Sequence, residues 1–94
     1  MDLRARVGRN IRRLRVEALM SQEALAVDAE LETVYVSRIE RGVANPTLRV
    51  LERIARALKV DGADLLGVDM VRVASPNLTP GRKSGRRTRR VGRR

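Results

Sequence analysis

The chain has 94 residues, enough for one small domain, with a net charge of +10 and neither cysteine nor histidine. Without these residue types there are no disulfides, thiolate or imidazole metal sites, cysteine nucleophiles or histidine acid–base groups, so we expect no enzyme, metal or cofactor. No apolar run reaches membrane-spanning length and no signal peptide is evident, so we expect a cytoplasmic protein without a membrane partner.

The first predicted helix covers about residues 2–19, where an apolar residue recurs every three or four positions from Leu3 to Ala18. Gly8 lies inside this helix and costs about 1 kcal/mol relative to alanine. We therefore expect another helix to approach closely at Gly8.

Two short helices follow the first one. Ser21 is a good N-cap for a helix that ends near residue 29. After a link of about three residues, a third helix is predicted to begin at Thr33 or Glu32 and to end at Gly42 in the left-handed conformation. Val36 and Ile39 are three positions apart in this helix, so they are expected to face the core.

Two more helices complete the predicted domain. One begins near Pro46 or Thr47, and its apolar face is formed by Leu48, Leu51, Ile54, Ala55 and Leu58. In the last, Asp61 and Asp64 have the spacing of a capping box, and Gly67 ends the helix. The sequence therefore predicts a compact all-α domain of five helices.

The composition changes after this domain. We expect the domain to cover residues 1–67, a linker or dimerisation extension to cover 68–74, and a disordered Arg-rich tail to cover 75–94. Eight of the 21 Lys and Arg residues lie in the tail, which has no acid, so the other 74 residues carry only +2. An acidic polymer suits such a tail, and double-stranded DNA is the first candidate. A merely solubilising tail is the alternative.

The second and third predicted helices have the tight link of a helix-turn-helix unit, whose second helix can lie in the DNA major groove. Its outer face is expected to carry short side chains and one long cation: Thr33, Val34, Ser37 and Arg38. Short side chains suit contacts to base edges, and an arginine can bind guanine O6 and N7 together. These residues alone leave a DNA-reading face and an ordinary solvated face as alternatives.

Four blocks of sequence occur in a characteristic order. They are Ser-Gln-Glu-Ala-Leu-Ala (21–26), Ser-Arg-Ile-Glu-Arg-Gly (37–42), Asn-Pro-Thr-Leu (45–48) and Ile-Ala-Arg-Ala-Leu (54–58). Together they resemble the Cro/CI (Xre-type) helix-turn-helix family over roughly residues 3–67, and Thr-Val-Tyr-Val-Ser (33–37) resembles the restriction–modification controller proteins. The resemblance implies a transcriptional regulator that binds a palindromic operator as a homodimer.

The resemblance also implies roles for single residues. It assigns base reading to Thr33, Val34, Ser37 and Arg38, and another DNA contact to Tyr35. It assigns phosphate binding to Gln22, Asn45, Arg41 and Arg49. It also implies a structural ion pair between Arg15 and Glu40. The alternatives are that Gln22 is only a helix former, Tyr35 a half-buried packing residue and Ser37 a donor within its own helix. The corresponding alternative for Arg41 and Arg49 is that they are ordinary solvated charges.

Glu30 departs from the family pattern, which usually has glycine in a turn with positive φ at this position. A non-glycine residue there is strained, so the geometry of the turn and the tilt of the third helix stay open. Controller proteins often have Asn or a similar residue there, which implies that the fold survives.

Of the apolar residues, those near the end of the domain are explained least well by packing in the core of a single chain. We expect them to form a twofold interface: Val60, Leu65, Leu66, Val68 and Met70. The alternative is that Leu65 or Leu66 caps the monomer core. A regulatory protein partner is one way in which the regulator could be controlled. The second class of function is an antitoxin-type or adaptor module whose basic tail binds a protein or RNA.

Overall fold

The computed structural model describes residues 2–68 and has five helices there. They are α1 (Leu3–Glu17), α2 (Gln22–Ala29), α3 (Thr33–Glu40), α4 (Leu48–Leu58) and α5 (Gly62–Leu66). No strand occurs in this part of the chain, so the predicted all-α fold is confirmed. None of its helices has the length and apolar character to cross a membrane. Met70, most of the predicted linker and the predicted tail lie outside the described residues.

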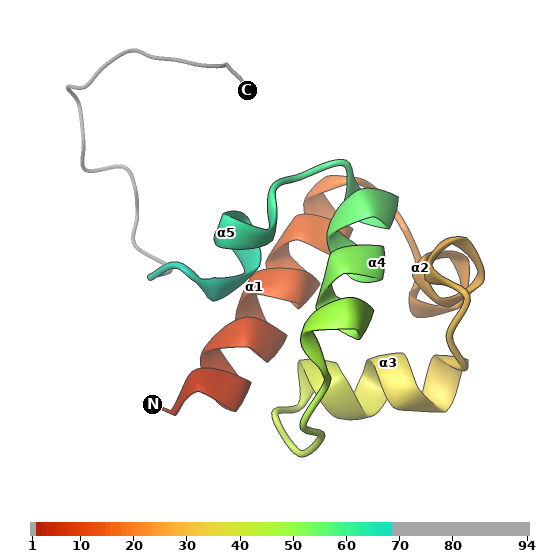
Figure 1. The fold of residues 1–94 in the computed structure, drawn as a ribbon. Coiled ribbons are helices and arrows are strands. Elements are labelled where there is room, and N and C mark those ends of the chain that lie inside the picture. The colour runs from red at the N-terminus through yellow and green to blue at the C-terminus, as the bar shows by residue number, and fades with distance from the viewer. Residues whose placement is uncertain (1, 69–94) are drawn as a thin grey trace, which may run out of the picture.

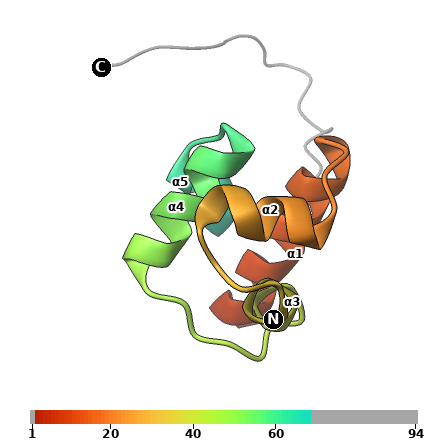
Figure 2. The same ribbon diagram turned by 90° about the vertical axis from the view of Figure 1, so that its right-hand side faces the viewer.

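The helices surround a small aliphatic core. α2 and α3 lie on one side of the α1–α4 pair, and α5 covers the other side (Figures 1 and 2). The side chains that are almost wholly buried come from all five helices: Ile11, Leu25, Val36, Ile39, Ile54, Leu65 and Asn10. Val36 and Ile39 thus face the core as predicted, and α3 lies at an edge of the molecule in both views.

Two predictions were wrong: the end of the first helix and the burial of one leucine. α1 ends at Glu17 and not near residue 19, because Leu19 takes a left-handed conformation with φ of 60° that stops the helix. Leu48 was assigned to the inner face of α4 but is 77% exposed. It is the first residue of α4 and borders two open hollows in the surface, so no helix covers it.

The helix ends follow the predicted capping residues. The Ser21 hydroxyl accepts the N–H of Ala24 at 2.9 Å, and the Thr47 hydroxyl accepts that of Val50 at 3.1 Å. Gly42 ends α3 with φ of 79°. The two hydroxyl groups satisfy N–H groups that have no partner inside a helix, so they favour the starts of α2 and α4.

The predicted close approach at Gly8 is present between α1 and α3. A Cβ atom built on Gly8 would lie 2.4 Å from the carbonyl oxygen of Ile39 and 2.6 Å from that of Glu40. Both neighbours are backbone atoms, so they cannot turn away as a side chain would. The absence of a side chain at this position therefore sets how closely α3 packs on α1.

A buried asparagine attaches α5 to α1, and the sequence did not indicate it. The amide of Asn10 donates to the carbonyl oxygens of Leu65 at 2.8 Å and Gly67 at 2.9 Å. Arg6 adds a longer bond of 3.4 Å to the carbonyl oxygen of Leu66. Asn10 thus satisfies carbonyl groups at the end of α5 that have no partner within the helix.

We predict that Gly8→Ala lowers the free energy of unfolding by about 1–3 kcal/mol, because the added methyl group forces α1 and α3 apart. Gly62→Ala is the matched control, since a Cβ there has no neighbour within 4 Å. Urea unfolding of both variants measures the difference. Equal midpoints for the two variants would contradict the proposed contact.

Candidate nucleic-acid interface

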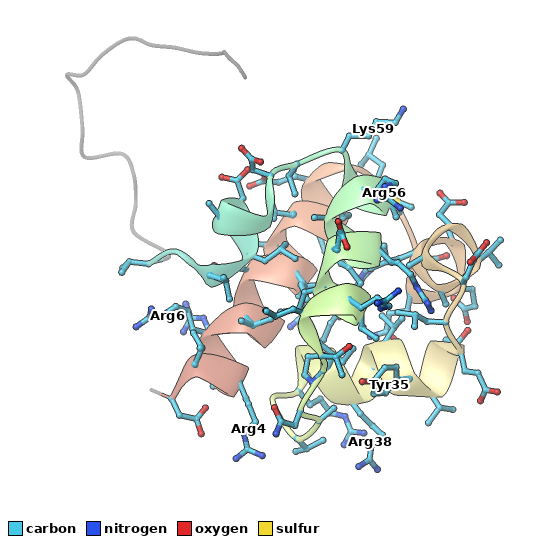
Figure 3. The ribbon with its side chains drawn as sticks, in the orientation of Figure 1. Arg4, Arg6, Tyr35, Arg38, Arg56 and Lys59 are labelled. Atoms are coloured by element: carbon cyan, nitrogen blue, oxygen red, sulfur yellow. The ribbon has the colours of Figure 1, made fainter. Side chains whose placement is uncertain are left out.

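α3 has one buried side and one open side. Val34 and Arg38 are exposed on the open side, and Thr33 and Ser37 are half-buried beside them. Positions 33, 34, 37 and 38 share a face because side chains four apart lie one above the other on a helix. Figure 3 shows Arg38 projecting from α3 away from the rest of the molecule. The structure therefore brings the four predicted base-reading residues to one surface.

Tyr35 has a different position from these four residues. Its side chain is half-buried and packs against the core, as the alternative interpretation required. Its phenol ring therefore helps to hold α3 in place. A contact between Tyr35 and DNA stays a prediction.

An ion pair connects α1 to the end of α3. Arg15 Nε lies 2.6 Å from Glu40 Oε2, and Arg15 Nη2 lies 3.0 Å from Glu40 Oε1. The two side chains are only 13% and 3% exposed. Arg15 also donates to the carbonyl oxygen of Met20 at 2.9 Å. The hydrogen bond to Glu40 raises the pKa of the Arg15 guanidinium above its usual value, so Arg15 stays charged.

Gln22 belongs to the same network. Its amide nitrogen donates to Glu40 Oε1 at 3.0 Å, so one carboxylate joins α1, α2 and α3. An amide nitrogen carries two hydrogens, and this bond uses one of them. Gln22 is therefore held in place at the start of α2 and keeps one donor for a phosphate, and that contact stays a prediction.

The turn between α2 and α3 contains the strained residue that the sequence indicated. Glu30 is left-handed, with φ of 60° and ψ of 46°. Arg53, on α4, donates to the carbonyl oxygens of Ala29 at 3.1 Å and Glu30 at 2.9 Å. The fork of Arg53 stabilises the end of α2 and the turn together. Sequence reasoning missed Arg53, because it lies 23 residues after Glu30 in an ordinary helical pattern.

The other predicted phosphate-binding residues lie around the loop between α3 and α4. Arg41 follows α3, Asn45 lies in the loop and Arg49 lies in the first turn of α4. All three are exposed. They are therefore accessible to a polyanion beside the open side of α3.

The predicted dimer residues separate into two groups. Leu65 is completely buried within the single chain, so it has no surface to give to a partner, and we correct its assignment. Leu66 and Val68 are exposed, and Val60 is half-buried. Val60 and Leu66 border a hollow together with the exposed Leu48.

Residues 2–68 contain no group of three or more acidic side chains placed to hold a metal ion. The site consists of an exposed helix face, nearby cations and a buried network that orients them.

A family model described as a helix-turn-helix domain matches residues 6–66. The chain belongs to the helix-turn-helix domain family.

Several proteins similar to this chain are named as control proteins or transcription factors. Control protein C.BamHI of Bacillus amyloliquefaciens is 41% identical over 66 residues, which cover 69% of this chain and 82% of that protein. The restriction-modification controller protein C.AhdI from Aeromonas hydrophila has a TM-score of 0.65 at 34% identity, over 66% of this chain and 94% of its own. The hypothetical transcription factor NHTF from Neisseria has a TM-score of 0.69 at 42% identity, over 71% and 77%.

These likenesses confirm the resemblance to the Cro/CI-like and controller proteins. Membership of the helix-turn-helix family supports DNA-binding regulation. The relatives are regulators and not enzymes, which fits the expectation of a non-enzymatic protein.

We predict that Glu40→Ala lowers the free energy of unfolding by about 3–5 kcal/mol, because it leaves the mostly buried Arg15 without its counter-ion. Glu52→Ala is the control: Glu52 pairs with Arg56 at 3.9 Å on the surface, where a pair contributes about 0–1 kcal/mol. Urea denaturation measures both. If the two variants lose the same stability, the Arg15–Glu40 pair is not important for the fold.

Proposed function

We propose that the protein is a sequence-specific transcriptional regulator that binds a palindromic operator as a homodimer, with α3 in the major groove. One observation carries the proposal. α3 is anchored by Val36 and Ile39 on its inner side and presents an uncovered face with Thr33, Ser37 and Arg38. A rigid helix with short polar side chains and one arginine can enter the groove and contact base edges.

Phosphate contacts on either side of α3 would set its register on the duplex. Gln22 and the start of α2 are suited to one phosphate, because the N-terminal end of a helix attracts anions. Arg41, Asn45 and Arg49 are suited to phosphates on the other side. Such contacts add affinity without carrying sequence information.

We predict that Arg38→Ala weakens binding to the preferred duplex by roughly 1–3 kcal/mol and relaxes the preference at one base position. The reason is the loss of a side chain that can bind guanine through two hydrogen bonds. Binding to a library of single-base variants of that duplex measures both effects. A mutant with unchanged affinity and unchanged base preference would show that Arg38 is not a reader.

The proposed dimer surface comprises Val60, Leu66, Val68 and Met70, the last outside the described residues. Leu48 extends it, because this exposed side chain borders the same hollow as Val60 and Leu66. A twofold axis at this surface would let two copies of α3 reach successive major grooves, about 34 Å apart.

We predict that Leu66→Glu weakens dimerisation and that operator binding falls with it, because the charge would be desolvated at the interface. Val27→Glu makes the same change at a 74% exposed position on α2 and should leave the dimer intact. Sedimentation at micromolar concentration measures the mass. A wild-type monomer that binds one half-site tightly would disprove the dimer.

The basic segment 75–94 is proposed to contact phosphates next to the operator. It has eight positive charges and no aromatic residue to stack on bases, so it is expected to contribute affinity and little sequence preference. Arg-rich arms can also enter a narrow minor groove, so a preference for A·T-rich flanks is compatible with this role.

Deleting residues 75–94 should weaken binding to operator and scrambled duplexes by similar factors. The slope of log K against log salt should become shallower by up to about 0.9 per lost phosphate contact. Salt titrations of the full-length and truncated chains measure both. An unchanged slope would favour the second class of function, in which the basic segment binds a protein or RNA.

A further inference from the structure

The first turn of α1 lies against the end of α3. A Cβ atom built on Gly42, which follows α3, would be 3.1 Å from Cα of Ala5. Arg4 precedes Ala5, and Arg4 and Asn45 line the same hollow between α1 and the α3–α4 loop. Two segments that are distant in sequence therefore meet beside the proposed phosphate-binding loop.

Arg4 is directed toward the same side of the molecule as Arg38. Figure 3 shows both side chains projecting beyond the ribbon on the side where α3 lies, Arg4 from α1 and Arg38 from α3. The side chain of Arg4 is 51% exposed, and its ion-pair partner Asp2 is 62% exposed. A long, exposed guanidinium in this position can contact a phosphate next to the groove that α3 would occupy.

We infer that Arg4 binds a DNA phosphate outside the base pairs read by α3, and that Asp2 competes with DNA for Arg4. Asp2 Oδ2 lies 3.6 Å from Arg4 Nη2, a distance that indicates a weak, solvent-exposed pair. A phosphate can displace Asp2 from Arg4, but the nearby carboxylate still repels the DNA backbone. Asp2 therefore limits the affinity that Arg4 supplies.

Asp2 has a second role, and this role keeps its carboxylate ionised and therefore able to compete with DNA for Arg4. Its Oδ1 accepts the N–H of Ala5 at 2.9 Å and caps α1. This hydrogen bond is the largest cause that lowers the pKa of Asp2, and Arg4 contributes further. Asp2 therefore stays ionised wherever DNA binding is measured. A substitution that keeps the cap, such as Asp2→Asn, removes the charge without removing the helix start.

The chain offers a matched control for Arg4. Lys59 is also exposed and does not line the hollow of the proposed dimer surface. Figure 3 shows Lys59 at the end of the molecule opposite to Arg4 and Arg38. Arg4→Ala and Lys59→Ala thus change net charge equally, and they differ in which side of the molecule loses the cation.

The experiment uses the full chain and a duplex selected by the wild-type protein from a random library, with a scrambled duplex beside it. Arg4→Ala should weaken binding to both duplexes by roughly tenfold. It should also reduce the salt slope by about 1.8, which is 0.9 for each of the two phosphate contacts that a dimer would lose. Lys59→Ala should change neither quantity beyond the small effect of net charge, and neither variant should change the base preference.

Asp2→Asn should tighten binding in the wild-type background and have a smaller effect when Arg4 is already alanine. Equal salt slopes for Arg4→Ala and Lys59→Ala would overturn the inference, as would an Asp2→Asn gain that is independent of Arg4. The inference rests on the proposed function, but the two fail differently. If the wild type selects no duplex, the proposed function fails; if it selects one and Arg4→Ala behaves as Lys59→Ala, only the role of Arg4 fails.

Discussion

The buried carboxylate of Glu40 is the constraint on which the arrangement of the first three helices depends. It accepts two hydrogen bonds from Arg15 and one from Gln22, so α1, α2 and α3 meet at one charged group. A charge removed from water is tolerated only when its partners are complete, and here the partners come from two other helices. Gly8 lets the α3 backbone approach α1 at the same end of α3, close enough for this network to form.

This network explains how a very short helix can present a defined face. α3 has eight residues, too few for a stable helix in isolation. It is held by apolar packing of Val36 and Ile39, by the charged network at its end and by the Arg53 fork at the preceding turn. These contacts support α3 from one side. The opposite side is not needed for this support, and it carries the proposed base-reading residues.

Local chemistry made most of the fold predictable, and contacts distant in sequence account for the rest. Ser21, Thr47 and Gly42 act on residues within one turn, so their capping roles can be deduced from sequence. Asn10 and Arg53 bond to backbone groups 55 and 24 residues away, and nothing near them in sequence indicates those partners. Leu48 and Leu65 were misassigned for the same reason: helical periodicity gives a residue's side on its helix but not what covers that side. The predicted DNA contacts depend on family resemblance and on an exposed face.

The Arg53 fork has a consequence for how this chain could have changed over time. A left-handed turn is easy for glycine, whereas Glu30 carries a strain that the hydrogen bonds from Arg53 to the turn help to offset. A chain with glycine at position 30 would lose less stability without the fork than a chain with glutamate there, because glycine brings less strain to the turn. The replacement of glycine is therefore tolerated more readily after the arginine is in place than before. Position 30 and position 53 should then vary together among relatives, although they lie on different elements and neither is proposed to contact DNA.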